Sequence, residues 1–143
     1  MAKPLISDIL KEVNKISTRD ERIAYLQEHD CTALRDILRI ALDDTIKLAL
    51  PDGRPPYKAY DLEAQQVDAP KQLRFEYPLF GNFIPAVTPK LNQFKREQLF
   101  VEMLQRIHPD EADLLCAAKD KDLSLKYVTK AIVKSAFPGL IKQ

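Results

Sequence analysis

The sequence predicts an all-α fold: one compact bundle of about six or seven helices, with an irregular Pro- and aromatic-rich segment over residues 51–88 wrapped on the core. Apolar side chains recur at helical spacing through residues 1–50 and 89–143. Helix-start signals precede these stretches. Seven of the ten prolines and two of the three glycines fall between Pro51 and Pro89. A chain of 143 residues can bury a core as one domain, and we expect a single domain over residues 1–143.

Two helices are predicted near the start of the chain. Residues 5–16 place apolar side chains at helical spacing, with charged side chains facing away. Thr18 and Glu21 then have the form of a capping box, in which the hydroxyl and the carboxylate each satisfy a free backbone N–H. We therefore expect a second helix that starts here and buries Ile23 and Leu26.

Two further helices are expected to complete the first fifty residues. Thr32 is predicted to cap the third helix, whose core stripe runs through residues 34–42. Asp43 and Asp44 interrupt this pattern, and we interpret them as capping residues at a helix junction rather than as catalytic carboxylates. Residues 45–50 are expected to form a short fourth helix, which the following proline ends.

The middle segment, residues 51–88, is predicted to be irregular. Its Pro-Pro-Tyr sequence at 55–57 favours an extended, polyproline-like backbone. Residues 73–77 alternate like a strand, but a lone strand would lack a partner, so we expect a helical turn within irregular structure. Six aromatic side chains lie within 27 residues here: Tyr57, Tyr60, Phe75, Tyr77, Phe80 and Phe83. We expect them to pack on the core, whereas any that stay exposed would form a surface for a protein partner.

Three helices are predicted after residue 88. Thr88 followed by a proline is typical of a helix start and predicts a long helix to about residue 106. His108 repeats this start, with acids in the first turn, and is interpreted as a helix cap. Ser124 is expected to open the last helix, which a Pro-Gly pair ends. The core face of the long helix is expected to comprise Leu91, Phe94, Phe100, Met103, Leu104 and Ile107.

No catalytic, metal or cofactor site is predicted. Three scattered glycines cannot build a phosphate cradle. His29 and Cys31 lie two residues apart and His108 and Cys116 lie eight apart, and neither spacing is typical of zinc. The two cysteines sit in or beside apolar helical stretches and are expected to be buried free thiols. We therefore expect a protein that is not an enzyme and that has no cofactor.

Positive charge gathers near the end of the chain. The formal net charge of +1 provides no global field for nucleic acid. From residue 119 to the end, however, there are six lysines against two aspartates, a local charge of +4. Lys126, Lys130 and Lys134 lie four residues apart, so on a helix they would line one face. This pattern fits either a solvated face or an anionic partner.

Three stretches resemble a known family. They are residues 6–26, from Ile-Ser-Asp-Ile-Leu-Lys to Ile-Ala-Tyr-Leu; the Leu-Arg-Asp-Ile-Leu-Arg-Ile-Ala-Leu helix at 34–42; and residues 123–141, which close on Phe-Pro-Gly-Leu-Ile. In this order they are similar to the N-terminal DNA-binding domain of ATP-dependent DNA ligases, the short phage form especially. The Pro-Pro-Tyr segment and the Lys-Arg-Glu-Gln-Leu-Phe stretch at 95–100 also resemble a group of small tailed-phage proteins.

The resemblance implies an all-helical accessory module that grips duplex DNA across the minor groove, mainly through phosphates. Ligase activity does not carry over, because the chain lacks the Lys-x-Asp-Gly adenylation motif. The chain also departs from the ligase pattern in its Pro-rich middle and at residues 122–125, where Asp-Leu-Ser-Leu replaces a glycine-containing approach to the last helix. The residues expected to bind DNA phosphates are Lys119, Lys121, Ser124, Lys126, Thr129, Lys130 and Lys134.

The sequence leaves a second class of function open: a protein-interaction module of a phage that does not bind DNA. Such a module would inhibit a host factor or join an assembly, so its partner would be a phage or host protein. No apolar run reaches the roughly 18 residues that span a bilayer, and the first residues show no secretory signal pattern. We therefore expect a cytoplasmic protein without a membrane partner, in the host cytoplasm if a phage encodes it.

Overall fold

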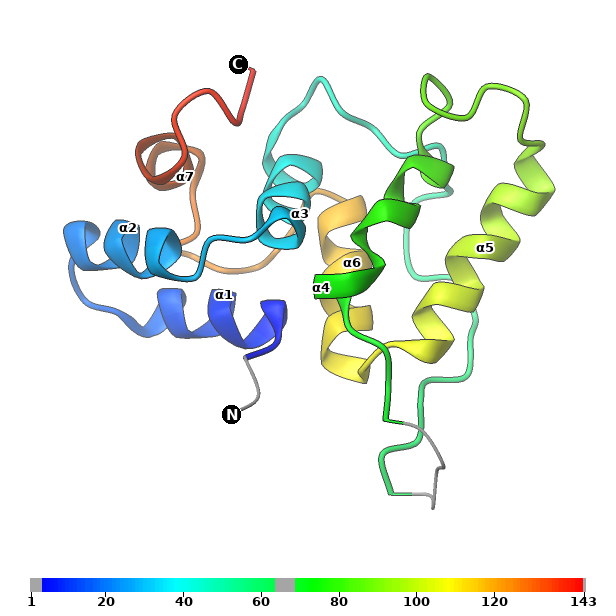
Figure 1. Ribbon diagram of the computed structural model, residues 1–143, viewed down its shortest axis with the longest axis horizontal. Coiled ribbons are helices and arrows are strands. Elements are labelled where there is room, and N and C mark those ends of the chain that lie inside the picture. Colours follow the sequence, from blue (N-terminus) through cyan, green and yellow to red (C-terminus); the bar gives the residue numbers. More distant parts are fainter. Residues whose placement is uncertain (1–3, 64–68, 143) are drawn as a thin grey trace.

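The computed structural model describes residues 4–63 and 69–142, and within them the chain is all-α (Figure 1). The described residues form seven α-helices and one 3-10 helix, in the order α1 (Ile6–Lys15), α2 (Arg19–Glu28), α3 (Thr32–Leu42), α4 (Leu73–Glu76), η1 (Tyr77–Phe83), α5 (Gln93–Arg106), α6 (Pro109–Lys119) and α7 (Lys130–Ala136). The predicted fold class is confirmed. The described residues contain no strand beyond one isolated parallel bridge, between Lys71 and Ile107.

The helices pack around one continuous hydrophobic cluster. α3 and α6 lie at the centre, where α3 packs on α6 and α4, and α6 also packs on α1 and α5. α2 and α7 pack on one another at one end of the molecule, and α5 lies at the other end beside η1 (Figure 1). The helices α7 and α5 therefore contribute to surfaces at opposite ends of the molecule.

The hydroxyl half of the predicted capping box at Thr18 and the predicted cap at His108 are confirmed. The Thr18 hydroxyl accepts a hydrogen bond from the Glu21 N–H at 3.3 Å, and α2 begins at the next residue. His108 Nδ1 accepts the Asp110 N–H at 3.0 Å and caps α6. In both cases a side-chain acceptor satisfies a backbone donor that the first helical turn leaves free.

Two predictions in the first fifty residues are wrong. α3 begins at Thr32 itself, so this residue is not the cap. Residues 45–50 do not form a helix, because the C-capping residue of α3, Asp43, engages the residue that would begin it. One carboxylate oxygen of Asp43 accepts both the Thr45 N–H at 2.9 Å and the Thr45 hydroxyl at 2.6 Å. This local turn competes with the backbone hydrogen bonds that a helix there would need.

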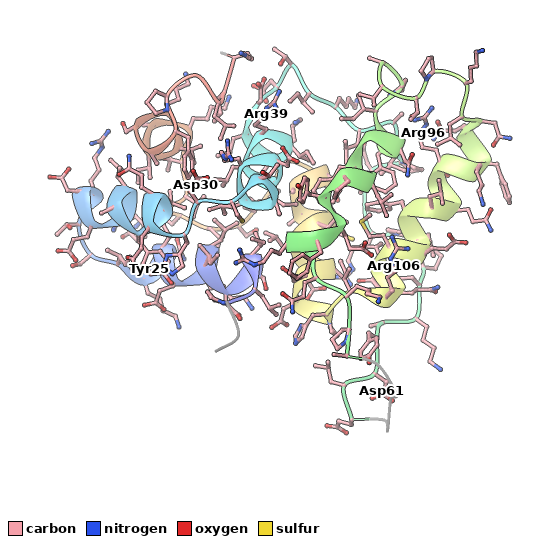
Figure 2. All side chains as sticks on the ribbon, in the orientation of Figure 1. Tyr25, Asp30, Arg39, Asp61, Arg96 and Arg106 are labelled. Atoms are coloured by element: carbon pink, nitrogen blue, oxygen red, sulfur yellow. The ribbon has the colours of Figure 1, made fainter. Side chains whose placement is uncertain are left out.

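The middle segment packs against the core, as predicted. Residues 54–61 have no regular structure, and residues 64–68 lie outside the described residues. The expected helical turn is α4, which continues into η1. An ion pair between Glu76 and Arg106, the latter labelled in Figure 2, ties α4 to α5. Of the six aromatic side chains in this segment, Phe80 and Phe83 are buried, Tyr57, Tyr60 and Tyr77 are half-buried, and Phe75 is 71% exposed.

The start of α5 differs from the prediction. The helix begins at Gln93 rather than at Thr88, because the Asn92 side chain accepts the Lys95 N–H at 2.7 Å and caps the helix there. Phe94 consequently lies outside the core and is 80% exposed, which corrects its predicted place on the core face. The other predicted core residues of this stretch are buried, apart from a half-buried Leu91: Phe100, Met103, Leu104 and Ile107.

Arg96 explains why the residues before α5 are not helical. Its side chain is 3% exposed, and its guanidinium donates to the carbonyl oxygens of Asn82, Thr88 and Leu91 and to the Thr88 hydroxyl, at 2.7 to 3.1 Å (Figure 2). The carbonyl groups of this loop are therefore directed at the arginine, where a helix would need them aligned with its axis.

Candidate nucleic-acid interface

Of the seven predicted phosphate-binding residues, two lysines are bonded inside the protein and five residues are exposed. The last helix also starts later than predicted, which changes where the exposed residues lie. α7 begins at Lys130 rather than at Ser124. Ser124 has a positive φ of 56° and donates its N–H and its hydroxyl to Asp122 Oδ1, at 3.2 and 3.1 Å. A residue in this conformation cannot continue a right-handed helix. Lys126 therefore lies in a loop, and the predicted helical stripe is reduced to Lys130 and Lys134.

Lys119 is an internal residue. Its side chain is 3% exposed, and its ammonium donates to the carbonyl oxygens of Pro51 and Gly53 at 2.8 and 2.9 Å and pairs with Asp120. A lysine ammonium has three donors, so its hydrogen-bonding capacity is used up inside the protein. Lys119 thereby fastens the start of the middle segment to the end of α6.

Lys121 is also committed to internal acceptors. Its ammonium donates to the carbonyl oxygens of Ile40 and Asp43, at 2.6 and 3.0 Å. Carbonyl groups at the C-terminal end of a helix lack an intrahelical donor, and the negative end of the helix dipole favours a cation there. Burial lowers the pKa of Lys121. The side chain therefore closes the end of α3.

Three of the predicted lysines are exposed near the α2–α7 end of the molecule: Lys126, Lys130 and Lys134. Lys130 pairs with Asp44 at 3.0 Å. The ammonium of Lys126 lies 5.3 Å from the centre of the Tyr127 ring, at cation–π distance. All three remain accessible to an anionic partner.

The two predicted hydroxyl residues serve their own backbone. The Thr129 hydroxyl accepts the Ile132 N–H at 3.3 Å and caps α7. The Ser124 hydroxyl is bonded to Asp122 at 3.1 Å. Both residues are exposed, and a hydroxyl that makes one hydrogen bond has capacity for another. They are close in sequence to the three exposed lysines, but their hydrogen bonds serve the loop before α7 and the start of that helix.

α2 also contributes basic and aromatic-stacking side chains to this end of the molecule, which the lysine pattern does not indicate. Arg19 is exposed and donates to the Ser135 hydroxyl on α7 at 2.7 Å. The guanidinium carbon of Arg22 lies 3.9 Å from the centre of the Tyr127 ring, which is 36% exposed. One sequence signal pointed to this role, because an arginine at the first position of a helix opposes the helix dipole and needs another reason to be there.

These residues define a surface that we call the α7 face: Arg19, Lys126, Tyr127, Lys130 and Lys134. Residues 123–143 carry four lysines and no aspartate or glutamate, whereas the other 122 residues carry 18 basic and 21 acidic side chains. The near-neutral total therefore conceals a positive end. Its rim includes two acids, Asp44 beside Lys130 and Asp20 at 4.0 Å from Arg19.

The two cysteines are free thiols. Cys116 is buried, as predicted, and Cys31 is half-buried. Burial raises the pKa of the Cys116 thiol, which disfavours the reactive thiolate. Across residues 4–63 and 69–142, no three His, Cys, Asp or Glu side chains are grouped to hold a metal ion. Among the described helices, none has both the length and the apolar character needed to cross a membrane.

Comparison with known proteins places the chain in a family. No curated protein matches the chain. The sequence profile of a family of unknown function, DUF6433, matches residues 9–125. The matched region contains most of the core, the Arg96 loop and the internal lysines Lys119 and Lys121, and it ends before α7. Because the match covers well over half of its length, the chain belongs to the DUF6433 family.

Proposed function

We propose that the chain is a non-catalytic accessory module that binds duplex DNA through phosphate contacts at the α7 face. The observation that carries the proposal is the charge arrangement, in which exposed lysines and Arg19 gather at one end of a chain whose other residues are acidic overall. Phosphate neutralisation by Lys and Arg supplies essentially all of non-specific DNA affinity. The resemblance to ligase DNA-binding domains supports the same reading, and the resemblance to tailed-phage proteins supports a phage origin.

The proposal rests on fewer lysines than the sequence pattern indicates. Lys119 and Lys121 are excluded, because their ammonium groups are bound to internal acceptors. Contacts by Lys126, Lys130 and Lys134 alone would give a slope of log affinity against log salt of about −2.7, whereas five lysine contacts would give about −4.5. Arg19 would add about −0.9. The salt slope therefore distinguishes three or four phosphate contacts from five.

The test is fluorescence anisotropy with a labelled duplex of about 30 base pairs, intact and nicked, over a salt series from about 50 mM. Lys126→Glu/Lys130→Glu/Lys134→Glu should abolish binding. The matched control is Lys58→Glu/Lys90→Glu/Lys95→Glu, which makes the same change in net charge at exposed lysines outside the α7 face. Equal losses in both variants would mean that bulk charge, and not the α7 face, binds DNA. Absence of binding at the lowest salt would refute the proposal.

A protein-interaction module without DNA binding is the second candidate function, and two exposed phenylalanines favour it. Phe75 on α4 and Phe94 on α5 are 71% and 80% exposed. Aromatic side chains are enriched at protein interfaces. An apolar interface should persist at about 0.5 M NaCl, where charge contacts are screened. A partner retained at that salt by the wild type, and lost by Phe75→Ser/Phe94→Ser, would support this function.

A further inference from the structure

A pocket of about 410 Å³ lies beside α5, and its lining includes no residue of the α7 face. Its walls are residues 50–56, at the start of the middle segment, one turn of α5, and Lys119 at the end of α6. The apolar part of the lining is Leu50, Pro51, Pro55, Pro56, Phe100 and Val101. The volume falls within the roughly 300–1,000 Å³ of sites that bind small ligands.

The two basic residues that line this pocket are already neutralised. Lys119 pairs with Asp120, and Arg54 pairs with Asp113. Lys119 also holds two carbonyl groups of the 50–56 wall, at 2.8 and 2.9 Å. Since its side chain is almost completely buried, this lysine positions the wall and is not available to a ligand.

The two acidic residues of the lining, Asp52 and Glu97, have no cationic partner among the described residues. Glu97 accepts one hydrogen bond, at one of its oxygens, from the Gln93 side chain at 3.0 Å. The pocket therefore combines an apolar interior with an excess of negative charge. Glu97 is half-buried and Asp52 is exposed, and a nearby cation stabilises an unpaired carboxylate in either setting.

The backbone of the pocket wall adds to the same preference. Three of the seven residues at 50–56 are prolines, which have a carbonyl oxygen but no N–H donor. The Gly53 N–H is already donated to Asp120 Oδ1, at 3.1 Å. The wall is therefore poor in donors, and a ligand that donates hydrogen bonds fits it better than one that accepts them.

We propose that this pocket binds the side chain of an arginine or lysine on a partner protein. The aliphatic stem of such a side chain would pack on Val101 and the prolines, and its charged head would meet Glu97 and Asp52. Arginine fits better than lysine, because its guanidinium carries five donors and is always charged. The proposal is independent of DNA binding, because the two surfaces share no residue.

The probe is a blocked tripeptide with arginine between two leucines, titrated into the ¹⁵N-labelled full chain and followed by amide chemical shifts. We expect saturable shifts confined to residues 50–54 and 97–101. Glu97→Gln should weaken the affinity about three-fold, the scale of one exposed ion pair. Glu102→Gln is the matched control, because this glutamate lies on the same helix and accepts a similar bond, from Gln98 at 3.4 Å, but does not line the pocket.

Four results would overturn the proposal. They are the absence of shifts at these residues up to about 10 mM peptide, equal affinity for a peptide with glutamine in place of arginine, and equal losses in the two glutamate variants. The fourth is the same set of shifts on raising the protein concentration without peptide, which would make a second copy of the chain the occupant. Saturable shifts that favour arginine and weaken with Glu97→Gln alone would support it.

Discussion

Glu111 is a completely buried carboxylate that joins the starts of two helices. Its Oε2 accepts the Ile6 N–H at 3.0 Å, and its Oε1 accepts the Leu73 N–H at 2.8 Å. These are the first residues of α1 and α4, whose N-cap residues Leu5 and Gln72 provide no side-chain acceptor. The carboxylate therefore satisfies donors that both helices leave free, and its negative charge suits both helix dipoles.

Replacement by glutamine keeps the shape of Glu111 but leaves one acceptor oxygen for two donors. An unsatisfied buried donor costs about 1–3 kcal/mol. Removing the buried charge offsets part of this cost. We expect Glu111→Gln to lower the free energy of unfolding by about 1–2 kcal/mol, and Glu111→Ala, which leaves both donors unmatched, to lower it by about 3–4 kcal/mol.

Urea unfolding at neutral pH, followed by circular dichroism, measures this difference. Asp110→Asn is the control, since this half-exposed neighbour forms an ion pair with Lys11 at 3.7 Å and holds no buried donor. We expect the control to change the free energy of unfolding by less than about 0.5 kcal/mol. A Glu111→Gln protein as stable as the wild type would refute the conclusion that both carboxylate oxygens hold the two helix starts.

The pH dependence of the free energy of unfolding, compared between the wild type and Glu111→Gln, tests the environment of this carboxyl group. Burial raises the pKa of Glu111 above its ordinary value of 4.5. The native state therefore binds this proton more tightly than the unfolded state does. The resulting contribution to stability is fully present below 4.5 and is lost as pH rises through the raised native pKa. The wild type should lose stability relative to Glu111→Gln over that range, and the opposite trend would mean that burial does not set the pKa.

Three further predictions concern other parts of the fold. Arg96→Met should lower the free energy of unfolding by about 3 kcal/mol and accelerate amide exchange in the loop before α5, because four oxygens lose their donor. Hydrogen bonds hold the pKa of Asp43 at about 2, below its ordinary 3.8. Its ionised form therefore contributes to the stability of the fold above pH 3.8, and this contribution is lost as pH falls through 2. In acid urea titrations the wild type should therefore lose more stability than Asp43→Asn. Phe94→Ser should change the free energy of unfolding by less than about 0.5 kcal/mol, whereas Phe100→Ala should lower it by about 3–5 kcal/mol; thermal denaturation compares the two, and a large effect at Phe94 would mean that the start of α5 is buried.

Local sequence signals predicted the parts of the fold whose causes are local. The caps at Thr18 and His108 need only the turn that they begin, so their sequence pattern was sufficient. The prediction failed where another side chain competes for the backbone. Asp43 redirects the residues after α3, and Arg96 fixes the carbonyl groups of a loop that the Thr-Pro signal assigned to a helix.

The candidate site was harder to predict, because counting charges treats all lysines alike. Lys119 and Lys121 bind carbonyl groups that lie 66 to 81 residues away in the sequence. Arg19 reaches Ser135, which is 116 residues away. No periodicity encodes such contacts, so the pattern assigned two structural lysines to the surface and overlooked an arginine from α2.

Because the internal lysines are bonded inside the protein, the formal net charge does not describe how charge is distributed over the surface. With Lys119 committed inside the protein, the exposed charge is positive at the α7 face and negative at the α5 pocket, although the formal net charge is +1. Charges at opposite ends of the molecule (Figure 1) are largely screened from one another at physiological salt, where the Debye length is about 8 Å. If both proposals hold, DNA and a basic peptide should bind the same molecule together, each with little effect on the affinity of the other. A module of this kind would connect a basic protein to DNA without either ligand having to displace the other.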